Sequence, residues 1–191
     1  DSSTSRGLGD VYKRQQEYNI DGIRFDFTKG FTNNSNSGWD IQRQVLLKRM
    51  ADTIWSVNPD LFVILEHWGD NNEEKLLSDY GMMLWGNTTY NYRQAAMGYT
   101  NTSNFSNAVY KNRGWNAPHL ISYIESHDEE RLMYDVNTFG NNSQPNLYNV
   151  RDIDVGLQRA ELVSAFHFLI PGPKMLYMFS ELGYDLSLIH I

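Results

Sequence analysis

Residues 21–29 read Asp-Gly-Ile-Arg-Phe-Asp-Phe-Thr-Lys, a short apolar strand that ends in the carboxylate of Asp26. Arg24 lies two residues before this acid and Lys29 three residues after it. Because side chains alternate across a strand, Arg24 and Asp26 point to the same side. Two cations beside one carboxylate hold it ionised at neutral pH, as a nucleophile or an electrostatic stabiliser requires. Taken alone, the stretch fits a surface strand with a chance salt bridge equally well.

Two further segments repeat this design and favour a catalytic interpretation. Residues 61–68 read Leu-Phe-Val-Ile-Leu-Glu-His-Trp, an apolar run that ends in Glu66. Residues 120–128 read Leu-Ile-Ser-Tyr-Ile-Glu-Ser-His-Asp and end in His127 and Asp128. Near-continuous apolar runs are typical of parallel strands that are covered on both faces. Chemistry placed where such strands end is typical of a β/α barrel, so the three acids predict an active site at one barrel mouth.

The three segments resemble conserved regions of the α-amylase family of glycoside hydrolases. Residues 22–29 are similar to the second region, Glu66 with the apolar run before it to the third, and His127-Asp128 to the fourth. The segments occur in the family's order, and the likeness runs from about Gln16 to Asp185.

The resemblance implies a role for each of the matching residues. Asp26 is implied as the catalytic nucleophile, Glu66 as the general acid/base, and Asp128 as the third carboxylate, which braces and distorts the bound sugar. Arg24 would hold the nucleophile ionised, and Lys29 and His127 would bind substrate hydroxyls. We count Trp68 among the candidate substrate-binding residues as well, although Trp68 and His67 can equally well pack the loop after the acid.

These roles imply hydrolysis with retention of anomeric configuration through a covalent glycosyl-enzyme intermediate. Retaining enzymes set their two carboxyl groups about 5 Å apart, and neighbouring parallel strands lie about 4.8 Å apart. Asp26 and Glu66 at the ends of adjacent strands meet that demand. Glu66 must carry its proton near neutral pH, so we expect burial and neighbouring carboxylates to raise its pKa.

The expected fold class is α/β, a partial TIM (β/α)8 barrel that comprises roughly strands four to eight with their helices. The family's first region has no counterpart upstream of Asp26, and a whole barrel typically needs ~250 residues, whereas this chain has 191. We expect a partial catalytic domain over residues 16–185. Residues 1–15 and 186–191 resemble translated adapter sequence and are expected to be non-native extensions. Half a barrel also exposes sheet edges and apolar surface, so we expect the fragment alone to be inactive and poorly soluble.

The apolar pattern predicts the elements between these strands. We expect a helix over residues 40–57 with one broad apolar face formed by Ile41, Val45, Leu46, Leu47, Met50, Ile54 and Trp55. Further helices are expected over residues 72–80 and 155–170, and the start of another near Phe105. Short strands are expected over residues 81–86 and 174–179, and a long connection over residues 134–154. Asp70, Glu73 and Glu74 are interpreted as the solvated start of a helix.

Composition limits the classes of partner. A formal net charge of −7 and a pI near 5.1 argue against nucleic acid. The chain has no cysteine, which excludes thiolate catalysis and disulfides, and no apolar run approaches the length of a membrane span. Aromatic residues make up 14%, a share that suits an α-glucan partner, because flat rings pack on sugar C–H faces. Oligomeric state is left open.

Several functional alternatives remain open within the resemblance. A transglycosylase, an α-1,6-glucan-active enzyme and a non-catalytic glucan-binding protein are alternatives to the leading interpretation, hydrolysis of α-1,4 bonds in starch or maltooligosaccharides. Export to the cell surface or medium is expected, because polymeric starch does not enter a cell. The chemistry needs no cofactor. The Gly30 carbonyl, where many family members have His, can still serve a structural calcium whose other ligands lie in the missing half.

Overall fold

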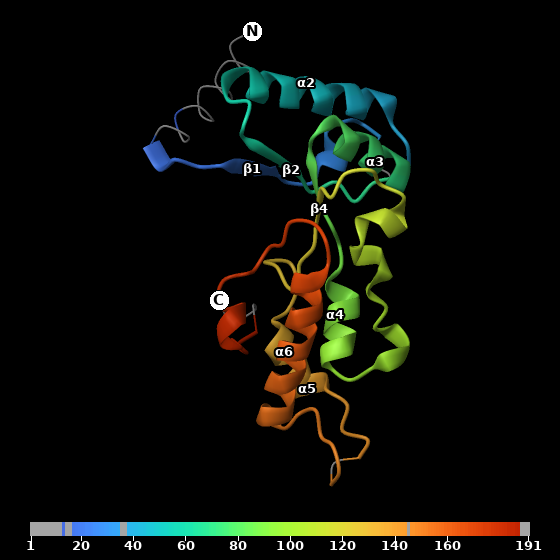
Figure 1. The fold of residues 1–191 in the computed structure, drawn as a ribbon, viewed down its shortest axis with the longest axis vertical. Coiled ribbons are helices and arrows are strands. Elements are labelled where there is room, and N and C mark those ends of the chain that lie inside the picture. The colour runs from blue at the N-terminus through green and yellow to red at the C-terminus, as the bar shows by residue number, and fades with distance from the viewer. Residues whose placement is uncertain (1–12, 14–16, 35–37, 145, 188–191) are drawn as a thin grey trace. The chain divides into compact units, whose positions relative to one another are not determined.

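The structure is a computed structural model that describes residues 13, 17–34, 38–144 and 146–187 (Figure 1). The described residues form two compact units. Unit 1 comprises the residues up to Trp85 together with Trp115–His119, and unit 2 comprises Gly86–Gly114 and the residues from Leu120 onward. Of the expected non-native extensions, residues 1–12, 14, 15 and 188–191 lie outside the described residues.

Unit 1 is built on parallel strands. Strand β1 (Gly22–Phe25) pairs in parallel with β2 (Phe62–Leu65), and β2 pairs in parallel with β3 (Met83–Trp85). Helix α2 (Ile41–Val57) connects β1 to β2, and helix α3 (Asn71–Tyr80) connects β2 to β3. The prediction of a mixed α/β fold with parallel strands is therefore confirmed, as is the β-loop-helix-β order of this part of the chain.

Local chemistry explains where the two helices of unit 1 begin and end. The Asp40 carboxylate accepts hydrogen bonds from the backbone N–H groups of Gln42 and Arg43, which lack partners within the helix. Asp70 caps α3 in the same way. Helix α3 ends at Gly81, which has a φ of 118°, a backbone conformation that glycine adopts with little strain. Both helices therefore start at an aspartate that the sequence places directly before them.

The predicted apolar face of α2 is wrong in part. Leu47 and Ile54 are buried as expected, but Ile41, Val45 and Leu46 are exposed. The buried face instead follows the spacing Arg43, Leu47, Ala51 and Ile54, with Gln44 beside it. The cause is a buried ion pair between Arg43 and Glu73 of α3, which turns the charged side chain rather than the apolar ones inward.

Unit 2 is mainly helical. It contains strand β4 (Leu120–Ile121) and helices α4 (Thr89–Ala96), α5 (Leu132–Phe139) and α6 (Ile153–Leu169). Its core includes Tyr92, Ala96, Met133, Val136, Val150 and Val163. The Arg159 guanidinium of α6 donates to the C-terminal carbonyl of Ala96 on α4, which joins the two helices beside this core.

Four predictions about unit 2 need correction. The expected long connection over residues 134–154 contains most of helix α5, because Leu132, Met133 and Val136 present an apolar face to the core. The expected strand over residues 174–179 is a single parallel bridge between Lys174 and Ser122. The strand expected over residues 120–128 is confined to β4 and this bridge at Ser122. The helix expected from Phe105 is two short 3-10 helices, η3 (Phe105–Ala108) and η4 (Tyr110–Arg113), because Val109 between them is extended.

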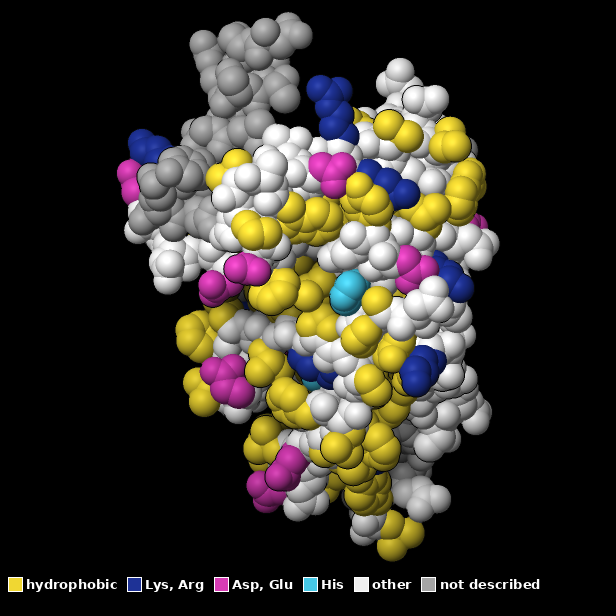
Figure 2. Space-filling view, turned by 45° about the horizontal axis from the view of Figure 1, so that its top comes forward, with side chains coloured by type: hydrophobic (Ala, Val, Ile, Leu, Met, Phe, Trp, Pro, Cys, Tyr) yellow, Lys and Arg dark blue, Asp and Glu magenta, His cyan; other side chains and the backbone are white. Residues whose placement is uncertain are grey.

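Helix α6 is apolar around most of its circumference, and a large share of that surface faces solvent. Leu162, Phe166, Phe168 and Leu169 are all exposed. The molecular face drawn in Figure 2 carries many exposed apolar side chains. Exposed apolar patches of this kind are typical of surfaces that meet another partner. No helix in the described ranges is long and apolar enough to cross a membrane.

Buried His167 is expected to make stability depend on pH. Burial lowers the pKa of His167 to about 4, so the folded chain keeps the ring neutral while the unfolded chain takes up a proton below pH 6.5. Stability therefore falls as the pH falls from about 6.5 towards 4, by on the order of 3 kcal/mol for this group. Urea unfolding at pH 7 and pH 4 should show that His167→Phe loses that part of the difference.

A matched packing variant controls for this substitution. Phe168 packs against the His167 ring with 5.7 Å between the ring centroids but does not titrate. Phe168→Leu should therefore lower stability about equally at both pH values. An unchanged pH dependence in His167→Phe would contradict the assignment.

Candidate active site

The register of two parallel strands brings Asp26 and Glu66 together. Phe25 is paired with Leu65, and each acid is the next residue along its strand. The backbone N–H of Glu66 donates to the Phe25 carbonyl at 2.9 Å, and the N–H of Thr28 donates to the Glu66 carbonyl at 2.8 Å. The hydrogen-bonded ladder thus continues past the strands, so both acids stand on ordered backbone at the carboxyl edge of the sheet.

Arg24 joins the two carboxylates. Its Nη2 lies 3.2 Å from Oδ1 of Asp26 and also forms an ion pair with Oε2 of Glu66. The guanidinium packs over the ring of Trp85, with 4.9 Å from its carbon to the ring centroid. Asp26 and Arg24 share one side of the strand, as predicted from their spacing, and Glu66 completes a site of two acids around one cation.

The two acids differ in their exposure. The Asp26 side chain is 76% exposed, whereas that of Glu66 is 6% exposed. Two carboxylates in unlike environments are the arrangement that divides nucleophile and acid roles, because burial disfavours a charged carboxylate. The raised pKa expected for Glu66 stays a prediction.

Two aromatic residues beside these acids adopt strained backbone conformations. Phe27 directly follows Asp26 and has a φ of 43°, and Trp68 follows Glu66 by two residues and has a φ of 48°. A positive φ is uncommon for bulky residues, and such strain gathers at functional sites. The Lys29 ammonium lies 5.3 Å from the centroid of the Phe27 ring, which is itself exposed.

The Phe27 ring also lies close to Gly30. A Cβ atom at residue 30 would lie 2.6 Å from two carbons of that ring, closer than side-chain atoms approach. A side chain at this position would require the exposed Phe27 ring to move.

The two residues after Glu66, His67 and Trp68, differ in their burial. His67 is 1% exposed and points into the interior, so it packs rather than lines a groove. Trp68 is half-buried, and its Nε1 is buried without a hydrogen-bond partner among the described residues. Substrate binding by Trp68 and by Lys29 stays a prediction.

Sequence reasoning missed a buried polar network directly behind the acids. Glu73 and Glu74 are buried, so their interpretation as a solvated helix start is wrong. Glu73 pairs with Arg43 of α2, with 2.7 Å from Nε to Oε1, and with His67, with 3.0 Å from Nε2 to Oε1. One feature of the sequence could have indicated this network. Arg43 lies four residues before the buried Leu47, on the same face of α2, and a buried arginine needs an acidic partner.

His127 and Asp128 belong to unit 2. Nε2 of His127 lies 3.4 Å from Oδ2 of Asp128, and both side chains are about half exposed. The Asp128 N–H donates to the Ser126 hydroxyl at 3.2 Å, which orders the turn that carries the pair. The convergence of Asp128 with Asp26 and Glu66 stays a proposal.

Unit 2 also holds a buried acid and base that the sequence did not predict as a pair. Glu125 accepts from the N–H of Leu132, at the start of α5, and pairs with Arg131 at 3.4 Å. Burial raises the pKa of Glu125, although the Leu132 hydrogen bond and the Arg131 charge oppose that shift. Arg131 is buried, and its guanidinium packs over the rings of Tyr177 and Tyr184.

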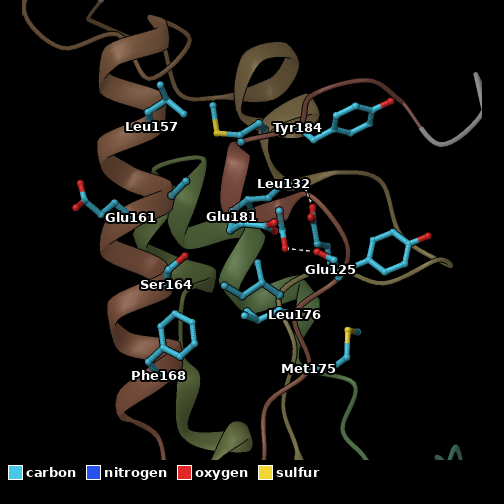
Figure 3. Close-up of a pocket in the computed structure, with 16 residues that line it drawn as sticks. Glu125, Leu132, Leu157, Glu161, Ser164, Phe168, Met175, Leu176, Glu181 and Tyr184 are labelled. Atoms are coloured by element: carbon cyan, nitrogen blue, oxygen red, sulfur yellow. Dashed lines mark hydrogen bonds between the residues drawn. The ribbon is translucent and has the colours of Figure 1, made fainter. Parts of the chain in front are cut away.

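A pocket of about 410 Å³ opens beside Glu125 (Figure 3). It lies between α5, α6 and the segment that follows Lys174, and most of its lining is apolar, including Leu132, Leu157 and Leu176. None of the residues predicted from the sequence as catalytic or substrate-binding lines it.

A structural calcium with the Gly30 carbonyl among its ligands stays a prediction. Within the described part of the chain, no group of three or more His, Asp and Glu side chains is placed to hold a metal ion. The residues present do not form a site by themselves, and we derive no step through calcium.

The Arg24 bridge should be measurable as a coupling energy. Arg24→Gln should destabilise the chain because it leaves the buried Glu66 side chain without its cation, and Glu66→Gln should do so because it removes one of the two acids that pair with Arg24. The double variant should cost less than the sum, with a coupling of roughly 1–3 kcal/mol in urea unfolding at pH 7. Arg49→Gln on the exposed side of α2 is the matched control and should show no coupling with Glu66→Gln. Additive single effects at Arg24 and Glu66 would contradict the bridge.

Comparison with known proteins supports a fold relationship. The sequence matches no family model and no curated protein. An α-amylase from Anoxybacillus is a structural match at 17% identity and a TM-score of 0.57, over 95% of this chain and 36% of that one. A pullulanase from Klebsiella pneumoniae matches at 13% identity and a TM-score of 0.64, over 93% of this chain and 24% of that one.

A third match is a hydrolase of cyclic α-maltosyl-(1→6)-maltose from Arthrobacter globiformis, at 18% identity and a TM-score of 0.61, over 96% of this chain and 36% of that one. The chain thus spans 24–36% of these three structures. The fold of the described chain is similar to part of the enzymes of the α-amylase family.

Proposed function

We propose that this chain is part of a retaining glycoside hydrolase that acts on α-glucans, built on the second half of a β/α barrel. The observation that carries the proposal is the pair of acids, Asp26 and Glu66, at the ends of adjacent parallel strands and bridged by Arg24. The structural neighbours named above support the same class of reaction. Starch and maltooligosaccharides with α-1,4 bonds are the proposed substrates.

In the first step, exposed Asp26 attacks the anomeric carbon and Glu66 protonates the departing glycosidic oxygen. In the second step, Glu66 takes a proton from water, which releases the sugar from Asp26. Carboxyl groups about 5 Å apart suit this sequence, because no water has to fit between the nucleophile and the sugar.

The shared guanidinium suggests how Glu66 alternates between acid and base. While Asp26 is a free carboxylate, it attracts Arg24, and Glu66 can hold its proton. Once Asp26 is esterified by the sugar, it has no charge, and Arg24 then stabilises Glu66 as a carboxylate, the form that acts as a base. Contact of one Nη2 atom with both acids is the geometry that this exchange needs.

The remaining candidate residues complete the proposed site. Asp128 is proposed as the third carboxylate, and Lys29, His127 and Trp68 as substrate-binding residues. Action outside the cell is part of the proposal, because a polymeric glucan does not cross a membrane.

A second candidate is an α-1,6-active enzyme or a transglycosylase with the same acids. The substrate of the Arthrobacter neighbour contains an α-(1→6) bond, so an α-1,6 bond is a second candidate for the bond that is cleaved. A non-catalytic glucan-binding protein is less well supported, since this chain retains both acids in contact with one cation.

Replacing the nucleophile should abolish turnover and spare binding. In the complete protein that carries this chain, Asp26→Asn should lower kcat on maltooligosaccharides at least about 10³-fold, because an amide does not form the ester intermediate. Glucan affinity, measured by calorimetry, should stay within a few fold. Asp60→Asn, in an exposed turn of unit 1, is the matched control and should keep wild-type turnover. Full activity in Asp26→Asn would refute the proposed nucleophile.

The stereochemistry of the product gives an independent check. Proton NMR of the first product from an α-glucan should show the α-anomer before mutarotation, because two displacements at one carbon restore its configuration. A first product in the β form would indicate direct attack by water and exclude a covalent role for Asp26.

A further inference from the structure

We propose that His67 and Thr28 are positioning residues that tie the turn after Asp26 to the turn after Glu66 and so set the separation of the two carboxylates. The proposal rests on the function proposed above and extends it to residues that touch no substrate. Both side chains are buried, Thr28 at 0% and His67 at 1% exposure. Their contacts run from helices α2 and α3 to the backbone of Glu66.

The outer end of the network is fixed by charge. Glu73 accepts from Nε and Nη2 of Arg43, at 2.7 and 3.0 Å, with both side chains fully buried. Arg43 also donates to the carbonyls of Lys29, Asn34 and Gly38. Every N–H group of this guanidinium is used, and two of these bonds fix the Glu73 side chain as their acceptor.

That acceptor sets the tautomer of His67. Nε2 of His67 lies 3.0 Å from Oε1 of Glu73, so Nε2 carries the hydrogen and donates it. Burial lowers the pKa of His67, and the Arg43 and Lys29 charges act in the same direction, whereas Glu73 opposes it. A neutral ring with its hydrogen on Nε2 leaves Nδ1 as an acceptor.

The inner end of the network reaches the two acids through Thr28. The Thr28 hydroxyl lies 2.9 Å from Nδ1 of His67 and 3.1 Å from the Glu66 carbonyl, and its single hydrogen is shared between these two acceptors. The backbone N–H of Thr28 donates to the same carbonyl at 2.8 Å. Thr28 is also two residues after Asp26. One buried threonine therefore links the backbone of both acids to the imidazole.

Gly69 shows that the placement of the imidazole is demanding. A Cβ atom at residue 69 would lie 2.7 Å from Cδ2 and 2.8 Å from Nε2 of His67. The chain folds closely over this ring, so the ring has little room to shift. His67 thus acts as a rigid spacer between α3 and Thr28.

The test compares Thr28→Val with Thr28→Ser in the complete protein. Valine keeps the shape and loses the hydroxyl, whereas serine keeps the hydroxyl. Thr28→Val should lower kcat about tenfold with KM unchanged, because small displacements of reacting groups are costly, and Thr28→Ser should restore it. The ¹³C carboxyl resonances of Asp26 and Glu66 should shift in Thr28→Val and not in Thr28→Ser.

A second pair of variants tests the network from the imidazole. His67→Asn retains a polar atom near the Nδ1 position, and His67→Gln one near the Nε2 position. Since the link to Thr28 is the one that positions the acids, His67→Asn should retain more kcat than His67→Gln. His119→Asn is the matched control, because His119 contacts the Ser78 carbonyl on the far end of α3. If circular dichroism shows that Thr28→Val does not fold, the comparison of His67→Asn with His67→Gln tests the proposal instead.

The outcomes separate this proposal from the proposed function. Wild-type kcat and unshifted carboxyl resonances in Thr28→Val would overturn the positioning role, as would an imidazole ¹⁵N spectrum that places the His67 hydrogen on Nδ1. Shifted carboxyl resonances in a protein that hydrolyses no α-glucan would support the positioning role and refute the proposed function.

Discussion

The parallel pairing of β1 with β2 is the constraint on which the candidate site depends. Phe25 opposite Leu65 leaves Asp26 and Glu66 as the next residues on neighbouring strands, and Arg24 lies on the same side to contact both. Because successive side chains alternate, a slip of one residue in either strand would turn its acid to the other face. In β2 such a slip would place His67 where Glu66 now stands.

The interior behind the acids is polar rather than apolar, which has a physical cost. Taking Arg43 and Glu73 out of water is unfavourable, and their attraction offsets it only when hydrogen bonds satisfy the remaining groups. Here the guanidinium donates to Glu73 and to three backbone carbonyls. An apolar replacement of similar volume would stabilise the fold comparably but would not hold His67 in one orientation. This is the expected exchange of stability for a defined geometry at a site.

Unit 2 shows a different balance of forces. Its core is apolar, but Glu125 and Arg131 are buried together at the start of α5, where the carboxylate also accepts from the helix backbone. Helix α6 covers this core with one side and exposes apolar residues such as Leu162 and Leu169 with another. A helix that is apolar on several sides is typical of the interior of a larger protein. This pattern agrees with a chain that spans only part of its structural neighbours.

The order of amino acids alone was sufficient for the two strands that precede Asp26 and Glu66, for the helix capped by Asp40, for a helix close to the bounds of α3, and for the placement of Arg24 beside Asp26. These features depend on local spacing: a period of two in strands, a period of 3.6 in helices, and capping side chains next to the groups that they satisfy. Folding in three dimensions decided the rest. The inward turn of Arg43, the burial of Glu73 and the link from His67 to Thr28 join residues far apart along the chain, and no local periodicity reports whether a distant partner will satisfy a buried charge. Helix α5 was missed, and a strand was expected over residues 174–179 where only Lys174 is paired, because tertiary packing outweighs weak local preference.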